Sequence, residues 1–170
     1  MPSKQPILAT LRLKTSDGLF TAHYSAAGLA QLDFPRGGRT PETPAASPTI
    51  RRWHNLASRA VRRVLRGRPA GQTPPLDLAG ATPFQARVWT ALRRIQAGGT
   101  QSYGRVAAAI GAPGAARAVG GACRANPVPL LIPCHRVLAS DGGLGGFSGG
   151  PRWKRKLLGV EKMEWRAGRS

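Results

Sequence analysis

The chain has 170 residues, 41% of them hydrophobic, which is enough for one ordinary domain or two small ones and excludes global disorder. Its 26 lysines and arginines outnumber its 7 aspartates and glutamates, giving a formal charge of +19 that both halves share. A basic tail on a neutral body is therefore excluded. Such a charge indicates an anionic partner, for which DNA, RNA and acidic membranes are the candidates, and we favour nucleic acid.

The cysteine and hydropathy patterns indicate the compartment. Cys123 and Cys134 are the two cysteines, and the three histidines are scattered, so we expect neither a metal site nor a cofactor. The N-terminus lacks an apolar stretch of signal-peptide length, and no segment is long enough to span a bilayer. We therefore expect a cytoplasmic protein with two free thiols and no membrane partner.

The first 34 residues have the pattern of three strands. Apolar and polar residues alternate from 7 to 13, and Asp17-Gly18 then gives a turn signal. Residues 19–24 and 28–34 predict two further strands, so an antiparallel meander is expected.

A loop, a helix and a boundary follow. Residues 35–48 are rich in Pro, Gly, Ser and Thr, which predicts a mobile loop. Residues 50–67 have helical apolar spacing, with arginines on the other face. We interpret those arginines first as a solvated face and second as a binding site. Residues 69–81 form the predicted boundary between the halves.

The second half predicts helices. Thr82-Pro83 is a cap followed by proline at the first helical position, and Gly98-Gly99 ends that helix. Two shorter helices are predicted at 102–110 and 115–124, joined by a glycine-containing turn, which is the pattern of a helix-turn-helix.

The second of these short helices has almost no side-chain bulk. Around Gly120-Gly121 only Arg117 and Val119 are large. Close packing against another helix would explain this, and so would close approach to the narrow minor groove of DNA. In the second case Arg117 could enter the base stack. We give the two interpretations equal weight on this pattern alone.

Cys134 is the candidate nucleophile because His135 follows it, although a buried core thiol is the simpler interpretation. Neighbouring side chains of an extended segment point to opposite faces, so either the backbone bends here or a water joins the two groups. The glycine-rich segment 141–150 follows and could bring backbone N–H groups close to a ligand.

Several motifs in order resemble the O6-alkylguanine-DNA alkyltransferases, the methylated-DNA–protein-cysteine methyltransferases. The resemblance covers about 82–161 and includes the active-site run 126–137. The other matching segments are Thr82-Pro83-Phe84-Gln85, Ser102-Tyr103-Gly104, Arg117-Ala118-Val119-Gly120 and Phe147-Ser148-Gly149-Gly150. Residues 1–81 match only in general layout.

The resemblance implies roles for five catalytic residues. Cys134 would accept the alkyl group, His135 would take the thiol proton through a water, and Glu161 would orient His135. Asn126 would act as a hinge between the helix-turn-helix and the active-site segment. Tyr103 would help to rotate the nucleotide and donate a proton to guanine N3.

The resemblance also implies a DNA surface and a base pocket. Arg117 would fill the gap left by the flipped base, and the whole expected DNA surface is Arg117, Ala116, Ala118, Gly120, Arg124 and Arg136. The expected base pocket is Pro129, Val137, Phe147 and Ser148. Phe147 stands where many relatives carry tyrosine, and Arg105 where an acidic residue is frequent.

The expected fold is α+β. Residues 1–78 should form a small ribonuclease-H-like domain of sheet plus helix, and residues 82–165 a mostly helical, winged-helix-like domain. The expected function is irreversible, stoichiometric transfer of the alkyl group from O6-alkylguanine, and from O4-alkylthymine, in duplex DNA to Cys134. The expected state is a monomer, with cooperative neighbours on DNA left open. A non-catalytic damage sensor and a hydrolytic Cys/His enzyme are the alternatives.

Overall fold

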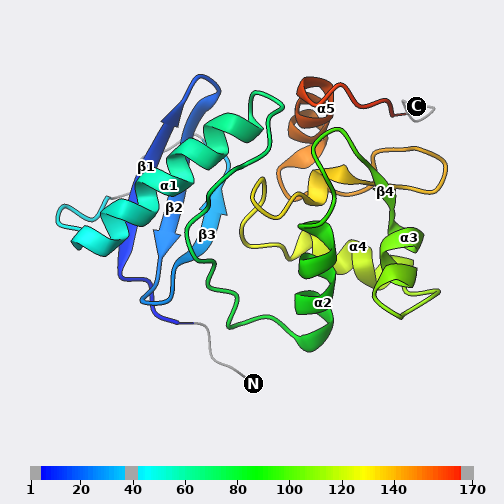
Figure 1. Ribbon diagram of the computed structural model, residues 1–170, viewed down its shortest axis with the longest axis horizontal. Coiled ribbons are helices and arrows are strands. Elements are labelled where there is room, and N and C mark those ends of the chain that lie inside the picture. The colour runs from blue at the N-terminus through cyan, green and yellow to red at the C-terminus, as the bar shows by residue number, and fades with distance from the viewer. Residues whose placement is uncertain (1–4, 37–41, 166–170) are drawn as a thin grey trace.

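The computed structural model describes residues 5–36 and 42–165. It is a mixed α/β structure in which a small sheet carrying one helix stands beside a helical part, at opposite ends of the long axis (Figure 1). Within the described residues, no helix combines the length and the apolar character needed to cross a membrane. Part of the predicted 35–48 loop, residues 37–41, lies outside the described residues.

The predicted three-stranded meander is confirmed. Strands β1 (Ala9–Thr15), β2 (Gly18–Tyr24) and β3 (Leu29–Asp33) pair antiparallel in chain order. The Asp17-Gly18 turn puts Gly18 at a φ of +118°, where a Cβ would lie only 2.9 Å from Pro35. Glycine is therefore required at this turn, because it adopts the positive φ without strain and has no Cβ to clash with Pro35.

Helix α1 (Pro48–Val64) lies across the sheet and closes the first core. Ser47 caps it by accepting a hydrogen bond from the backbone of Ile50, and proline takes the first helical position. Its apolar stripe is buried against the sheet, and its arginines face outward. The predicted amphipathic helix is thus confirmed, although it ends at Val64, three residues before the predicted end at residue 67.

The second half contains the predicted helices α2 (Pro83–Leu92), α3 (Tyr103–Ala109) and α4 (Ala116–Arg124), but α2 ends at Leu92 and not, as predicted, at Gly98-Gly99. Thr82 and Gln85 form a reciprocal capping box at the start of α2. Four further elements were not predicted from the sequence: β4 (Gln101–Ser102), the 3-10 turn η1 (Cys134–Arg136), β5 (Val137–Leu138) and helix α5 (Gly150–Val160).

One hydrophobic core runs through both halves. An aromatic cluster joins them, because Phe34 at the end of β3 lies 5.6 Å from Phe147 and 4.9 Å from Trp153 between ring centroids. Phe20 of β2 packs on the same cluster. The sheet therefore supports the glycine-rich segment that carries Phe147.

Candidate active site

A short parallel pairing brings the active-site segment to the helix-turn-helix. Strand β4 pairs with β5 so that Gln101 faces Val137 and Ser102 faces Leu138. Tyr103 follows β4 directly and begins α3, while Cys134 lies just before β5. Two residues that are 31 positions apart in sequence are thus brought to one site.

Cys134 sits in a bend of the backbone. Residues 134–136 form a single 3-10 turn, and only 1% of Cys134 is exposed. The Asn126 side-chain amide donates hydrogen bonds to Cys134 Sγ at 3.1 Å and to the Ile132 carbonyl at 2.8 Å, and its oxygen accepts one from Val128 N at 3.0 Å. Asn126 therefore ties the end of α4 to the thiol segment, at the position predicted for the hinge.

Burial raises the pKa of the Cys134 thiol to about 11, although the hydrogen bond from Asn126 opposes this. At pH 7 only on the order of one molecule in ten thousand then carries a thiolate. Since the thiolate is the reactive form, the site needs a base that removes the proton as reaction proceeds.

His135 is placed to be that base. Its Nε2 lies 3.1 Å from Glu161 Oε1, and both side chains are fully buried. Burial lowers the pKa of His135, so the ring is neutral at pH 7. A carboxylate accepts only, so Nε2 carries the ring proton and Nδ1 holds the free lone pair. Nδ1 is buried and bonds to no other atom of the described residues.

Arg136 completes this group and corrects an expectation. It was expected on the DNA surface, but it is 93% buried and its guanidinium points inward. Arg136 Nε donates to Glu161 Oε2 at 3.0 Å, Nη2 to Oε1 at 2.7 Å, and Nη1 to the Ile95 carbonyl at 2.6 Å. Burial alone would raise the pKa of Glu161, but the bonds from His135 and Arg136 outweigh it and lower that pKa to about 2. We therefore assign Arg136 to the support of Glu161.

Tyr103 lies beside the glycine-rich segment. Its hydroxyl donates to the Gly146 carbonyl at 3.1 Å, and burial raises its pKa to about 12, so it keeps its proton at pH 7. Gly145 has a φ of +60°, and a Cβ there would lie 2.7 Å from Tyr103 Oη. Only glycine fits at this point, which was not singled out from sequence.

Lys154 is a functional candidate that sequence reasoning missed. It is fully buried on α5, and its ammonium donates to the carbonyls of Val137 and Leu144. Burial lowers its pKa to about 8, and charge on Cys134 or Cys123 would raise it. The available signal was its place on one helix face with Leu157 and Leu158.

The predicted DNA residues on α4 lie on its outer side. Arg117, Ala118 and Arg124 are exposed, and Ala116 and Gly120 are half-buried. Gly121 has open space where a Cβ would be, whereas Val119, Ala122 and Cys123 face the core. Because these side chains are small, the outer surface of α4 lies close to the helix backbone, and Arg117 projects from it. Cys123 is a buried, free thiol.

The four residues of the expected base pocket differ in their exposure. Pro129 and Val137 are buried, Phe147 is half-buried with its ring centroid 6.4 Å from that of His135, and Ser148 is exposed. Throughout residues 5–36 and 42–165, no three His, Cys, Asp or Glu side chains gather in a way that could hold a metal ion.

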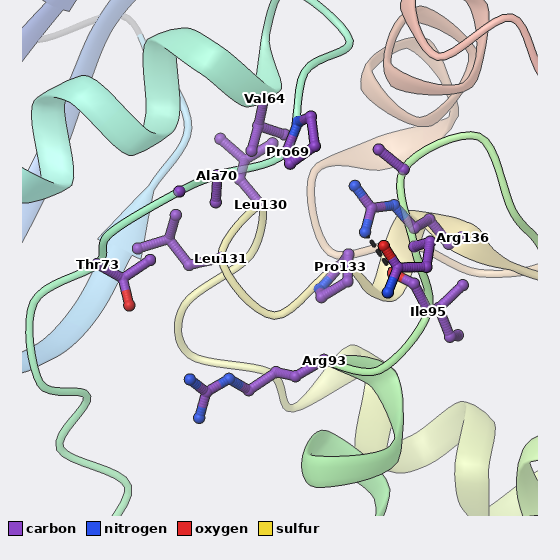
Figure 2. Close-up of a pocket in the computed structure, with 13 residues that line it drawn as sticks. Val64, Pro69, Ala70, Thr73, Arg93, Ile95, Leu130, Leu131, Pro133 and Arg136 are labelled. Atoms are coloured by element: carbon purple, nitrogen blue, oxygen red, sulfur yellow. Dashed lines mark hydrogen bonds between the residues drawn. The ribbon is translucent and has the colours of Figure 1, made fainter.

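A cavity of about 230 Å³ lies behind the active-site segment, between the end of α1 and the turn after α2. Figure 2 shows Leu130 and Leu131 on one side of it and Pro133 and Arg136 on the other. Neither Cys134 nor Tyr103 lines it. We therefore do not place the reacting base in this cavity.

Comparison with known proteins gives matches to one family. The family model described as "6-O-methylguanine DNA methyltransferase, DNA binding domain" matches residues 83–163. A methylated-DNA–protein-cysteine methyltransferase of Mycobacterium bovis is 56% identical over 87 residues, which are 51% of this chain and 52% of the relative. The chain thus matches about half the length of that relative.

Two further matches extend over most of the chain. A methylated-DNA–protein-cysteine methyltransferase of Methanosarcina barkeri is 39% identical over 139 residues, covering 82% of this chain and 87% of the relative. The crystal structure of Mycobacterium tuberculosis OGT in complex with DNA is similar with a TM-score of 0.74 and 36% identity. This likeness covers 90% of this chain and 92% of that one.

Proposed function

Because the chain belongs to the methylated-DNA–protein-cysteine methyltransferase family, we propose that it repairs O6-alkylguanine in duplex DNA by moving the alkyl group to Cys134. O4-alkylthymine is the second substrate. The observation that carries the proposal is the buried group of Cys134, Asn126, His135 and Glu161, in which Asn126 binds the thiol and Glu161 orients the neutral base that follows it in sequence.

The transfer follows from the protonation states of this group. The Cys134 proton passes through a water to His135 Nδ1, and Glu161 stabilises the imidazolium that forms. The thiolate then attacks the alkyl carbon, the S–C bond forms, and the C–O6 bond breaks with its electron pair left on guanine. The product is a thioether, which water does not cleave, so each chain reacts once.

Tyr103 assists the leaving group. Its raised pKa keeps the hydroxyl protonated, and it exchanges its bond to the Gly146 carbonyl for one to guanine N3 when the base enters. Transfer of the Tyr103 proton to N3 leaves a neutral base in place of an anion, and the tyrosinate regains a proton from solvent once the base has left. A hydrogen bond from Ser148 to O6 would act in the same direction.

The base must leave the stack to reach a thiol that is 1% exposed. The low outer surface of α4 fits the minor groove, which is about 6 Å wide, and Arg117 fills the space of the flipped nucleotide. Extrusion costs a few kcal/mol and is easiest for a weakly paired, damaged base, which favours alkylated sites.

The finer description of the molecule belongs to the same proposal. We take residues 1–78 as a ribonuclease-H-like domain and 82–165 as a winged-helix-like domain that acts as a monomer on DNA. The free thiols Cys123 and Cys134 suit the reducing cytoplasm.

The proposal is tested by intact mass. The protein is incubated with a duplex containing O6-methylguanine, and Cys134→Ala serves as the control. Repair predicts a gain of one methyl group, located on Cys134 by peptide mapping and absent from the variant. Binding without a mass gain would indicate the sensor alternative, and repeated turnover without a mass gain would indicate the hydrolytic one.

A further inference from the structure

The outer face of α1 carries a dense set of arginines that the repair site does not use. All are exposed, and they come from α1 and the turn that follows it. We call this set the α1 arginine face, and its members are Arg51, Arg52, Arg59, Arg62, Arg63 and Arg66. In Figure 1, α1 lies at one end of the long axis, while α3 and α4 lie toward the other.

No carboxylate neutralises this face. All seven aspartates and glutamates of the chain lie within the described residues. The ion pairs found there join Arg12 to Glu42, Lys156 to Asp17 and Arg136 to Glu161, while the rings of His23 and His135 contact Asp33 and Glu161. The other hydrogen bonds of these carboxylates go to nearby residues or to a serine, as in Asp77 with Ser25 and Asp141 with Gly143. The face therefore keeps its full positive charge.

Three of these arginines are held in place by hydrogen bonds to backbone carbonyls, which do not neutralise their charge. Arg62 donates to the Lys14 carbonyl at 3.0 Å, Arg63 to the Pro69 carbonyl at 2.8 Å, and Arg51 to the Ala46 carbonyl at 2.9 Å. Each acceptor is neutral. Arg59 and Arg66 make no such bond to other described residues, so their guanidiniums remain available.

The arrangement works against the stability of the helix. Arg59 is followed by Arg62 and Arg63, and Arg62 by Arg66, at the spacings that bring side chains together on one face. Like charges at such spacings cost about 0.2–0.5 kcal/mol a pair. A polyanion laid along the face would reverse this repulsion.

The other face of α1 excludes a membrane as the partner. An amphipathic helix binds a bilayer through a free apolar side, but Ile50, Ala57, Val61 and Val64 are buried against the sheet. Along the helix axis, Arg51 and Arg63 stand ~18 Å apart, which is a span of several phosphates of a duplex.

We propose that the α1 arginine face binds the phosphodiester backbone of a second DNA duplex, separate from the duplex held by α3 and α4. The inference goes beyond the proposed function, since it needs no damaged base and no chemistry at Cys134. One molecule would thereby bridge two DNA segments, with the second held through phosphates and independent of sequence.

Bridging is measured by fluorescence energy transfer between two short undamaged duplexes, of which one carries the donor dye and the other the acceptor. The full-length protein is added at one molecule per pair of duplexes. We expect transfer at about 50 mM salt that falls as salt rises. Arg59→Gln/Arg66→Gln should weaken bridging about tenfold or more and make the log–log salt slope shallower by about 2. Arg59→Lys/Arg66→Lys should restore it.

The matched control is Arg152→Gln/Arg155→Gln, which removes two exposed charges from α5. Bridging by this control should equal that of the parent protein. Equal loss in both double variants, no bridging by the parent, or binding of anionic vesicles in place of the second duplex would overturn the proposal. Running the assay in Cys134→Ala keeps its outcome separate from that of alkyl transfer.

Discussion

Arg136 and Glu161 form a two-point ion pair inside the protein, in which Nη2 lies 2.7 Å from Oε1 and Nε 3.0 Å from Oε2. The same oxygen, Oε1, lies 3.1 Å from His135 Nε2. One buried carboxylate therefore holds both the base and an arginine that fixes its orientation.

Removing Arg136 should destabilise the protein strongly. Arg136→Ala leaves Glu161 buried without its charge partner, a change that costs about 3–5 kcal/mol in comparable sites. Urea unfolding measures this free energy. Exposed Arg94→Ala is the control and should change it by less than about 0.5 kcal/mol. Equal stabilities of the two variants would contradict the assigned role.

The lowered pKa of Glu161 predicts how stability changes in acid. The carboxyl has a pKa of about 2 in the folded protein against an ordinary 4.5, so its contribution is complete above pH 4.5 and is lost as the pH falls toward 2. The full loss is on the order of 3 kcal/mol. Unfolding free energies measured across this window should fall less steeply in Glu161→Gln than in the parent, and parallel slopes would argue against the pair.

Asn126 should control the reactivity of the thiol. Asn126→Asp places an acceptor and a negative charge beside Cys134 Sγ, which raises the pKa of the thiol further. The rate at which iodoacetamide alkylates Cys134 is measured as a function of pH. The pH at which this rate rises should be higher in this variant than in the parent protein. Asn126→Ala loses three buried hydrogen bonds and should in addition unfold more easily. An unchanged alkylation profile in Asn126→Asp would remove Asn126 from thiol control.

Gly145 should be intolerant of any side chain. In Gly145→Ala the new Cβ would lie 2.7 Å from Tyr103 Oη at a φ of +60°, so Tyr103 must move. Such backbone strain costs about 1–3 kcal/mol, and a tenfold or greater loss of repair rate is expected. Gly146→Ala is the matched control, because its Cβ would meet only the end of the Arg124 side chain, at 3.9 Å. Repair at the parent rate in both variants would show that Tyr103 tolerates displacement.

Arg117 should matter for duplex DNA and little for a free base. Arg117→Ala removes the exposed side chain proposed to fill the flipped position, so repair of O6-methylguanine in a duplex should slow more than reaction with free O6-benzylguanine. Both rates come from the same quenched time course. Equal losses on the two substrates would show that Arg117 acts on the thiol site and not in base flipping.

The sequence predicted elements that depend on local pattern. The strands, α1 and the start of α2 at Thr82-Pro83 followed from spacing and caps alone. Helix α5 was missed because Gly149 gives its start no side-chain cap and a glycine-rich run precedes it. Strands β4 and β5 have two residues each, too few for any periodic pattern.

The site was predicted best where a motif carried it. The resemblance placed Cys134, His135, Glu161 and Asn126 in one group, and the structure joins Asn126 to Cys134 and Glu161 to His135. Arg136 was wrongly expected on the DNA surface, because an arginine in so basic a chain resembles its many exposed neighbours and its partner Glu161 is 25 positions away. Lys154 was missed because its burial depends on how α5 packs against the segment before it, which the local sequence does not indicate.

The central claim is that Cys134 accepts one alkyl group and is then spent. The most direct measurement is a titration of a fixed amount of protein with an increasing excess of duplex containing O6-methylguanine, followed by quantification of S-methylcysteine and of repaired guanine. The proposed function predicts that both reach a plateau at one per chain, with the methyl group on Cys134. Repair that continues beyond one guanine per chain, or a methyl group on Cys123, would contradict it.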